Sequence, residues 1–310
     1  MRAHMGPLEP EYAEDARIGD HVLGLVRFGS VTSQERQALT ISMTAVGAAN
    51  AEVWRSREPV VRGERDGIVF ARNGTAFFGM LVSSEKEIEK ATRQAYESIV
   101  AVTRQEGFPF VLRAWNHVRG INEGEGDCER YKRFSAGRHD ALTTAGLSRT
   151  EFPSASAVGM RDGELAIYFI ASRMAGRQVE NPRQVSAYLY PREYGPRPPS
   201  FARATVSSMN GSALVFVSGT ASVVGHETKH VGDVEAQTDE TICNLAGILG
   251  RSGAAPGDVR TMKIYVRRAA DWEGIAARLR QSFPAAGLLV LETEICRRDL
   301  LLEVEAVAIL

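Results

Sequence analysis

The spacing of apolar residues changes from strand to helix periodicity near residue 84. Between residues 67 and 82, two short apolar runs flank Asn73-Gly74, which favours a hairpin because both turn residues adopt positive φ at low cost. Apolar residues then recur at helical spacing from Ile88 to Val102, behind a capping box of Ser84 and Glu87. The pattern predicts a hairpin followed by an amphipathic helix of about five turns.

The same order of elements is predicted twice. In the first half the pattern continues with a strand over 110–118, a helix within 128–147 and two strands within 155–172. In the second half it gives strands around a turn at Asn210-Gly211, a helix from Asp233 to Gly250, and then a strand over 262–266, a helix over 272–283 and strands over 288–291 and 300–309. Both halves follow the order ββαβαββ. They predict an α+β fold of two tandem units, each a mixed sheet with helices packed on one face.

Proline marks the border between the halves. The chain has 310 residues, enough for two domains, and four prolines among residues 191–200 exclude regular structure there. We therefore expect an N-terminal extension over 1–50, a first domain over 51–190, a linker over 191–200 and a second domain over 201–310.

Composition narrows the range of partners. The 37 basic and 38 acidic side chains leave a net charge of -1, which disfavours nucleic acid and anionic membranes as partners. Cys128, Cys243 and Cys296 are far apart, so neither a disulfide framework nor a thiolate zinc site is indicated. With no apolar signal segment and no long apolar run, we expect a cytoplasmic protein that neither spans nor binds a membrane.

Two motifs that suggest cofactors do not fit their context. Residues 226–230, HETKH, match the HExxH zinc pattern, but that chemistry needs a helix, and Gly225 and Gly232 flank the motif after a β-rich segment. Gly195, Gly211 and Gly219 do not form a phosphate-binding glycine loop. We expect no metal and no nucleotide cofactor.

The last predicted strand carries two glutamates among apolar residues. Alternation places Leu302, Val304 and Ala306 on one face and Glu303 and Glu305 on the other. A buried Glu303 would keep its proton near neutral pH and could act as a general acid. The alternative is an edge strand whose glutamates face water. Cys296, seven positions earlier, could line the same pocket or be a small buried apolar residue.

Arginine and tyrosine cluster in two segments. Residues 130–138 read RYKRFSAGR, and Tyr190, Tyr194, Arg197 and Arg203 surround the prolines. Arginine forks and phenol hydroxyls suit a small dianion with two carboxylates. A solvated helix face beside an interdomain seam would have the same composition.

Five segments together resemble the chorismatase family, which releases pyruvate from chorismate. They are RAWNHVRGIN at 113–122, RYKRFSAGR at 130–138, YPREYGPRPPSFAR at 190–203, SGTASVVGHETKHVGD at 218–233 and CRRDLLLEVEA at 296–306. The resemblance runs from about residue 51 to the C-terminus and assigns the HETKH stretch to a family loop. It implies two tandem YjgF/RidA-like (chorismate mutase-like) domains and a protein without cofactors that acts as a monomer.

The resemblance also implies a site. Glu303 matches the family's acid, which protonates the methylene carbon of the enolpyruvyl ether. Candidate partners of the substrate, whose two carboxylates need cations, are Arg133, Arg138, Tyr190, Tyr194, Arg203, Gly219 and Arg298.

The product depends on the branch of the family. Cys296 resembles the branch that forms 3-hydroxybenzoate, in the usual setting of secondary metabolism, where this acid can serve as a polyketide starter unit. The alternatives are hydrolysis to a dihydroxycyclohexadiene carboxylate and a RidA-like enamine or imine deaminase or ligand-binding protein. A RidA-like activity is the lesser alternative, because Cys296, Arg297 and Arg298 replace the arginine and Leu-Pro expected before the last strand.

Overall fold

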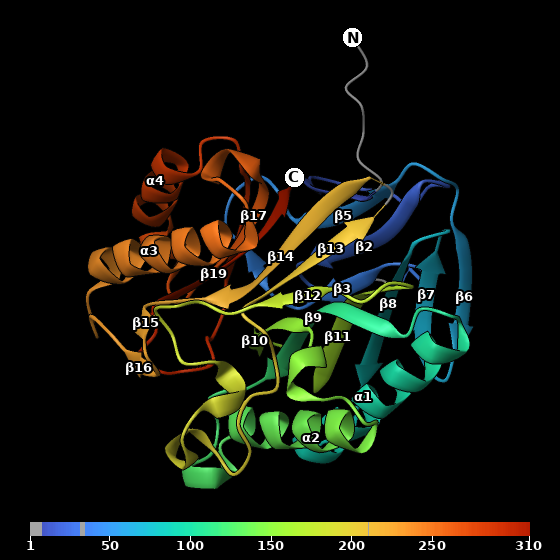
Figure 1. Cartoon of the computed structure of the whole chain (residues 1–310). Helices are drawn as coiled ribbons and strands as arrows, with labels where there is room; N and C mark the ends of the chain where they lie inside the picture. The colour runs from blue at the N-terminus through green and yellow to red at the C-terminus, as the bar shows by residue number, and fades with distance from the viewer. Residues whose placement is uncertain (1–7, 32–34, 210) are drawn as a thin grey trace.

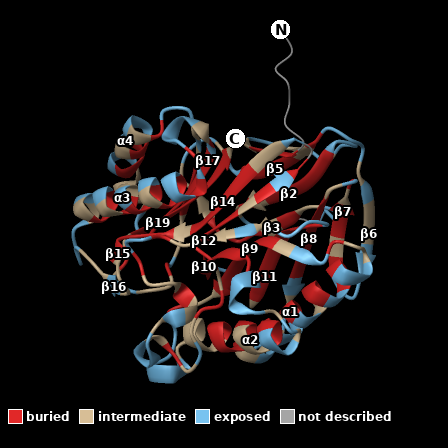
Figure 2. Cartoon of the chain, viewed as in Figure 1, coloured by how far each residue is buried: buried red, intermediate tan, exposed pale blue. Residues whose placement is uncertain are grey.

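A computed structural model describes residues 8–31, 35–209 and 211–310. Within these residues, three large β-sheets share one apolar core, and four α-helices cover the outer faces of two of the sheets (Figure 1). Burial follows this arrangement, since strand residues between the layers are buried and the outward helix faces are exposed (Figure 2).

The first domain is built on a six-stranded sheet of order β10-β9-β11-β8-β7-β6. Helices α1 (Ile88–Gln105) and α2 (Arg130–Thr144) pack on its outer face in a core that includes Phe77, Ile99 and Phe169. The strands are β6 (Val61–Arg65), β7 (Ile68–Arg72), β8 (Ala76–Ser83), β9 (Phe110–Arg119), β10 (Ser154–Met160) and β11 (Leu165–Ser172).

The second domain is built on a seven-stranded sheet of order β12-β13-β14-β19-β17-β18-β4. Helices α3 (Val234–Ser252) and α4 (Trp272–Ser282) pack on its outer face. The strands are β4 (Thr44–Ala45), β12 (Arg177–Val179), β13 (Ala204–Met209), β14 (Ser212–Thr220), β17 (Val259–Val266), β18 (Gly287–Glu292) and β19 (Leu302–Ile309), and β15 (Val223–Val224) pairs with β16 (Glu227–Thr228) as a small hairpin. Both domains follow the predicted order ββαβαββ.

The N-terminal region forms a third sheet rather than a simple extension. Strands β1 (Leu8–Ala13), β2 (Val22–Phe28), β3 (Leu39–Ile41) and β5 (Ala51–Ser56) are ordered β1-β5-β2-β3. The first two pairings in this sheet are antiparallel and the third is parallel. The strand sets β8-β11-β9-β10 and β14-β19-β17-β18 show the same pairings, and in all three sets the strands are the first, fourth, second and third along the chain. The predicted boundary after residue 50 therefore cuts this sheet, because β5 pairs with both β1 and β2.

The three sheets meet in a core of large side chains. Trp54 of β5 contacts Trp115 of β9 and Phe216 of β14, with ring centroids 5.8 and 6.0 Å apart. Strand β19 separates two environments, as its alternation predicts. Leu302, Val304, Ala306 and Ala308 pack under α3 and α4, whereas Glu303 and Glu305 are buried on the opposite face.

Helix ends differ from the prediction in two places. The N-cap of α1 is Glu87, whose carboxylate accepts from the N–H groups of Glu89 and Lys90, so the predicted cap at Ser84 is wrong. Helix α3 begins after the predicted cap Asp233 but continues past Gly250 to Ser252, and its C-cap Gly253 takes the left-handed conformation with φ 87°. Asn210 of the predicted second turn lies outside the described residues. None of the described helices has both the length and the apolarity to cross a membrane.

Candidate active site

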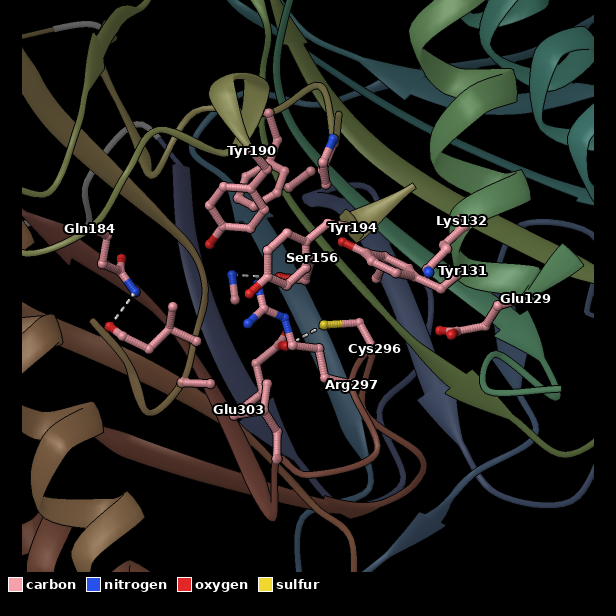
Figure 3. A pocket seen from close by; sticks show the side chains of 18 of the residues that line it. Glu129, Tyr131, Lys132, Ser156, Gln184, Tyr190, Tyr194, Cys296, Arg297 and Glu303 are labelled. Carbon is pink, nitrogen blue, oxygen red and sulfur yellow. Dashed lines mark hydrogen bonds between the residues drawn. The ribbon is translucent and has the colours of Figure 1, made fainter. Parts of the chain in front are cut away.

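A cavity of about 340 Å³ lies at the seam between the two domains (Figure 3). Its walls come from the start of α2, from β10, from the segment around the prolines, from the end of β14, and from residues 296–303. Lining residues include Tyr131, Arg138, Ser156, Gln184, Tyr190, Tyr194, Phe201, Arg203, Gly219, Cys296, Arg297, Arg298 and Glu303.

Hydrogen bonds from backbone N–H groups to serine hydroxyls hold these walls together across the two domains. The Ala155 N–H donates to Ser218 Oγ at 2.8 Å, and the Gly219 N–H donates to Ser156 Oγ at 3.0 Å. On the other side of β10, Val158 forms a bridge with Ile295, which brings the segment before β19 into the cavity. Edge strand β10 thus joins the first domain to β14, which carries Gly219, and to the segment before β19, which carries Cys296.

Glu303 is a buried carboxyl group in this cavity. Its residue is 5% exposed, so the alternative of a water-facing edge strand does not hold. Burial is the main cause that raises the pKa of Glu303 to about 8, and the neighbouring Glu305 carboxylate raises it further. A glutamic acid in this state holds its proton at neutral pH and can deliver it to a bound molecule.

Gly219 permits this position of Glu303. A Cβ atom at Gly219 would lie 1.9 Å from Glu303 Oε1, far inside van der Waals contact. A side chain at residue 219 would therefore have to displace the carboxyl group, which explains why glycine is needed here for close approach.

Cys296 contacts the other oxygen of the same carboxyl group. Its Sγ atom lies 3.8 Å from Glu303 Oε2, as the dashed line in Figure 3 marks. Burial, with the Glu303 charge as the second cause, raises the pKa of the Cys296 thiol well above its usual range. The group is therefore a neutral thiol that can donate to Glu303, rather than a thiolate nucleophile.

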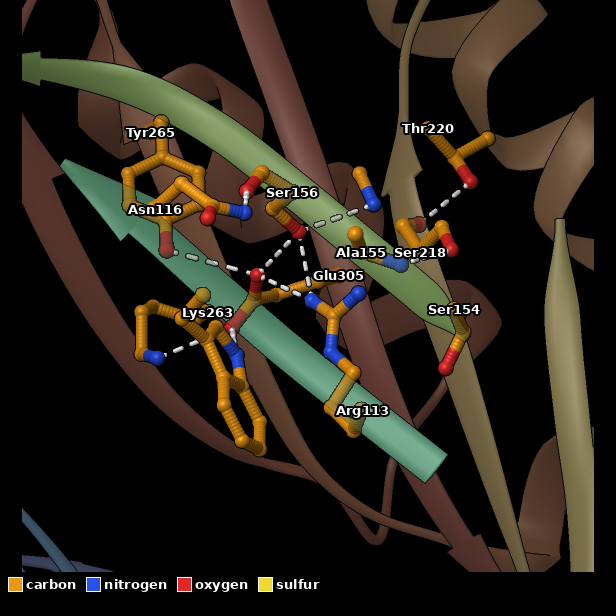
Figure 4. Close-up of polar contacts among 12 residues, drawn as sticks. Arg113, Asn116, Ser154, Ala155, Ser156, Ser218, Thr220, Lys263, Tyr265 and Glu305 are labelled. Atoms are coloured by element: carbon orange, nitrogen blue, oxygen red, sulfur yellow. Dashed lines mark hydrogen bonds and ion pairs between the residues drawn. The ribbon is translucent and has the colours of Figure 1, made fainter. Parts of the chain in front are cut away.

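Glu305 is as buried as Glu303, at 5% exposed, but it does not line the cavity and its carboxylate is paired with cations (Figure 4). Burial alone would raise its pKa, but the Lys263 ammonium and the Arg113 guanidinium lower it to about 2. Lys263 Nζ lies 2.8 Å and Arg113 Nη2 lies 2.6 Å from the carboxylate, which also accepts from Trp115, Ser156 and Tyr265. The two glutamates of one strand face are therefore in opposite protonation states.

Cationic side chains line the cavity without carboxylate partners. Among the described residues, Arg138, Arg203 and Arg297 form no ion pair within 4.0 Å. Arg138 is 1% and Arg203 is 6% exposed, and the Nε atom of each has no hydrogen-bond partner in the part of the chain described. Buried arginines in this condition favour an anionic ligand, because its negative charge would supply the missing partner.

Tyrosines complete the same wall. Arg203 Nη2 donates to the Tyr190 hydroxyl at 2.6 Å, and Arg297 lies over the Tyr194 ring with its guanidinium carbon 4.3 Å from the centroid. The Tyr194 hydroxyl lies 3.2 Å from His226 Nδ1. These contacts fix the segment that follows Tyr190 over the cavity.

Eight of the nine predicted site residues line this cavity. The ninth, Arg133, points away and pairs with Glu89 at 2.9 Å on the surface of α2, so the structure does not bring it to the site. Arg298 reaches the cavity, but its guanidinium donates to the backbone carbonyls of Asn122 and Gly124. It supports a neighbouring loop as well as lining the wall.

Sequence reasoning did not place several residues of the site. The sequence marks Arg297 only as a departure from another family's pattern and gives no prediction for Ser156 and Gln184, yet all three line the cavity. The alternation of serine and alanine along β10 could have indicated Ser156, because it places Ser154 and Ser156 on the same face of the strand. Gln184 sits in an irregular stretch where periodicity gives no signal.

The HETKH motif does not form a helix. Glu227 and Thr228 form β16, and His226 and His230 turn to different partners, Tyr194 and Glu240. Among the described residues, no cluster of three histidine, cysteine or acidic side chains could hold a metal ion.

Comparisons with known proteins agree with this geometry. A family model described as "Chorismatase FkbO/Hyg5-like, N-terminal" matches residues 52–171, and one described as "Endoribonuclease L-PSP" matches residues 199–310. Two relatives from Streptomyces hygroscopicus are a 3-hydroxybenzoate synthase, 38% identical over 94% of this chain and 92% of its own, and a chorismatase, 35% identical over 94% and 90%.

A solved structure extends the agreement to the whole fold. The crystal structure of a chorismatase at 1.08 Å resolution superposes with a TM-score of 0.88 at 31% identity, covering 97% of this chain and 98% of that one. This match includes the N-terminal sheet, since it covers nearly the full length of both chains. The chain therefore belongs to the chorismatase family of enzymes.

Proposed function

We propose that this enzyme converts chorismate to 3-hydroxybenzoate and pyruvate. The observation that carries the proposal is a protonated, buried Glu303 in a cavity lined by arginines that lack carboxylate partners. An acid of this kind and two anion sites are what an enolpyruvyl ether with two carboxylates requires. The names of the two Streptomyces hygroscopicus relatives support the same substrate.

Glu303 serves as the general acid. The enolpyruvyl group is an electron-rich alkene, so a proton delivered to its methylene carbon gives an oxocarbenium ion, from which the bond between the ether oxygen and the ring can break. Burial keeps the proton on Glu303 until substrate arrives. It also excludes bulk water, which could otherwise take up the proton in place of the substrate. Cys296 and Gly219 hold the carboxyl from both sides.

The arginines hold the dianion. Arg138 and Arg203 both contact the Phe201 ring, with guanidinium carbons 5.7 and 5.3 Å from its centroid, and Tyr190 is hydrogen bonded to Arg203. Arg297 is a further cation on the side of Cys296. Cations at two places in one cavity suit a ring carboxylate and an enolpyruvyl carboxylate, with a tyrosine hydroxyl orienting the ring.

Cys296 directs the outcome toward 3-hydroxybenzoate. Rearrangement to 3-hydroxybenzoate and pyruvate consumes no water, whereas formation of the dihydroxycyclohexadiene carboxylate consumes one molecule. A neutral thiol that fills the space beside Glu303 displaces the water that would otherwise attack. It also places a polarizable donor where a proton must move during aromatization.

Turnover of chorismate tests the proposal. The protein is incubated with chorismate while pyruvate is followed by reduction to lactate and the ring products are separated by chromatography. We expect equimolar pyruvate and 3-hydroxybenzoate, and no pyruvate from Glu303→Gln with a preserved melting transition. Pyruvate with the diene diol would indicate hydrolysis instead, and absence of pyruvate would contradict the proposed function.

The same proposal includes a cytoplasmic monomer. One chain supplies all three repeated sheets around the core and both walls of the cavity, so the site is complete without a second copy. All three cysteines are free, which suits a reducing compartment. Light scattering coupled to gel filtration should give the mass of one chain, and a larger mass would contradict this part.

A further inference from the structure

The face of β19 that carries Glu303 also carries Glu305, and the two carboxyl groups differ in their access to cations. The Glu305 carboxylate forms ion pairs with two buried cations, Lys263, whose Nζ lies 2.8 Å from Oε1, and Arg113, whose Nη2 lies 2.6 Å from Oε2. Glu303 has no ion pair within 4.0 Å among the described residues, and its carboxyl group accepts a hydrogen bond from the Cys296 thiol. The cavity acid is thus the unpaired member of the pair.

The charges of this buried group balance without Glu303. Lys263 bridges Glu305 and Glu52, whose Oε2 lies 2.6 Å from Nζ, and Arg113 pairs with Glu305. Lys263 is 0%, Arg113 is 1% and Glu52 is 2% exposed. Two cations and two carboxylates are therefore neutral together, and a third ionised carboxylate would be a buried charge in excess.

We propose that Glu305 is a positioning residue for the acid: by binding Arg113 and Lys263 it keeps both cations from Glu303, so that Glu303 stays a protonated donor facing the substrate. This inference rests on the proposed function of Glu303. It concerns a residue that does not contact the substrate, since Glu305 does not line the cavity.

Ser156 connects the two glutamates. Its hydroxyl donates to Glu305 Oε2 at 2.6 Å, accepts from Arg113, and accepts from the Gly219 N–H at 3.0 Å. The Ser156 hydroxyl therefore links the Glu305 carboxylate to the Arg113 guanidinium and to the backbone of Gly219, and Gly219 leaves space for the Glu303 carboxyl group. Loss of the Glu305 charge would free Arg113 next to the second carboxyl on the same strand face.

Other groups around Glu303 are fixed by their own contacts. The ionisable groups that face it are Glu305 on β19, Arg113 on β9, Tyr265 on β17, Tyr131 on α2, Cys296 before β19 and Arg203 before β13. Arg203 is held by the Tyr190 hydroxyl and the Val185 carbonyl. Arg113 is the cation whose partner can be removed by a single change on β19.

Two variants that should shift the pH dependence in opposite directions test the inference. Glu305→Gln removes the competing carboxylate and frees Arg113 for Glu303, so the alkaline limb of single-turnover pyruvate release should move to lower pH by about one unit or more. Arg113→Met removes the cation instead, and should move the same limb to higher pH. Glu52→Gln is the matched control, because it removes a buried carboxylate from the same lysine but does not act on Glu303. Its limb should stay in place.

A second readout does not depend on turnover. Infrared difference spectra of the unliganded protein follow the carbonyl stretch of the protonated carboxyl, assigned by its loss in Glu303→Gln. The band should disappear at lower pH in Glu305→Gln and at higher pH in Arg113→Met. Should one variant fail to fold, the direction seen in the other decides.

The outcomes separate this inference from the proposed function. Equal loss of rate at every pH in Glu305→Gln, with an unmoved limb and band, would mean a purely structural role and overturn the inference. A shift of the same size in Glu52→Gln would also overturn it. If the wild type releases no pyruvate but the band shifts as expected, the proposed function fails while the role of Glu305 in holding the Glu303 proton stands.

Discussion

Replacement of Glu303 by glutamine should stabilise the protein at alkaline pH while abolishing its activity. The substitution keeps the shape of the side chain and removes a carboxyl group that must ionise inside the cavity as pH rises. Active-site residues are often retained at a cost in stability, and the size of that cost follows here from the raised pKa of Glu303.

The magnitude can be worked from the pKa of Glu303, which burial raises from 4.5 to about 8. A group whose pKa is higher in the folded than in the unfolded state contributes stability that is complete below the unfolded value and is lost as pH rises to the folded value. One pKa unit corresponds to about 1.4 kcal/mol, so the difference between 4.5 and about 8 is equivalent to about 5 kcal/mol of free energy of unfolding. About 3 kcal/mol of this stability is lost by pH 7. Glutamine does not titrate and avoids this loss.

Urea unfolding at pH 5 and pH 8 measures the effect. The free energy of unfolding of Glu303→Gln minus that of the wild type should grow by several kcal/mol between the two pH values, because titrations elsewhere cancel in the difference. Glu193→Gln, at a cavity glutamate whose side chain is 65% exposed, is the control and should show no such growth. Parallel pH dependence of Glu303→Gln and wild type would refute a protonated Glu303.

Three other substitutions test separate parts of the site. Gly219→Ala should lower kcat roughly 10²-fold with little change in melting temperature, because its Cβ displaces the end of the Glu303 side chain and not the backbone, and an unchanged kcat would contradict this. Cys296→Ala should divert product from 3-hydroxybenzoate toward the diene diol, as chromatography would show, and an unaltered product ratio would remove the proposed role of the thiol. Arg138→Met should lower kcat/KM for chorismate by roughly 30-fold or more, whereas Arg133→Met on the same helix should not, and equal effects would place the carboxylate elsewhere.

Local periodicity accounts for the parts of the fold that were predicted. Strand β19 shows this best, because alternation alone assigns Leu302 and Val304 to the helix side and Glu303 to the opposite face. Helix α2 gives no comparable signal. Residues 134–138 are all buried in succession, so helical spacing does not separate the buried Arg138 from Arg133, which pairs with Glu89 instead.

The third sheet and the charge network depend on information that periodicity lacks. Strand β3 is three residues long and β4 is two, and the described residues between the N-terminal strands contain no helix, so the repeat of strand order is visible only in the pairing. Glu305 binds Arg113 across 192 positions of sequence. Whether a buried glutamate is ionised depends on such distant partners, and the sequence pattern treated Glu303 and Glu305 alike.

Single turnover in deuterium oxide is the most direct test of proton delivery to the enolpyruvyl methylene. Chorismate is mixed with excess enzyme, pyruvate is trapped at once as lactate, and its methyl group is analysed by mass spectrometry. The account predicts one deuterium in each methyl group and a slower rate than in water, because the exchangeable proton of Glu303 ends on that carbon. Pyruvate without deuterium, formed at the same rate in both solvents, would contradict it.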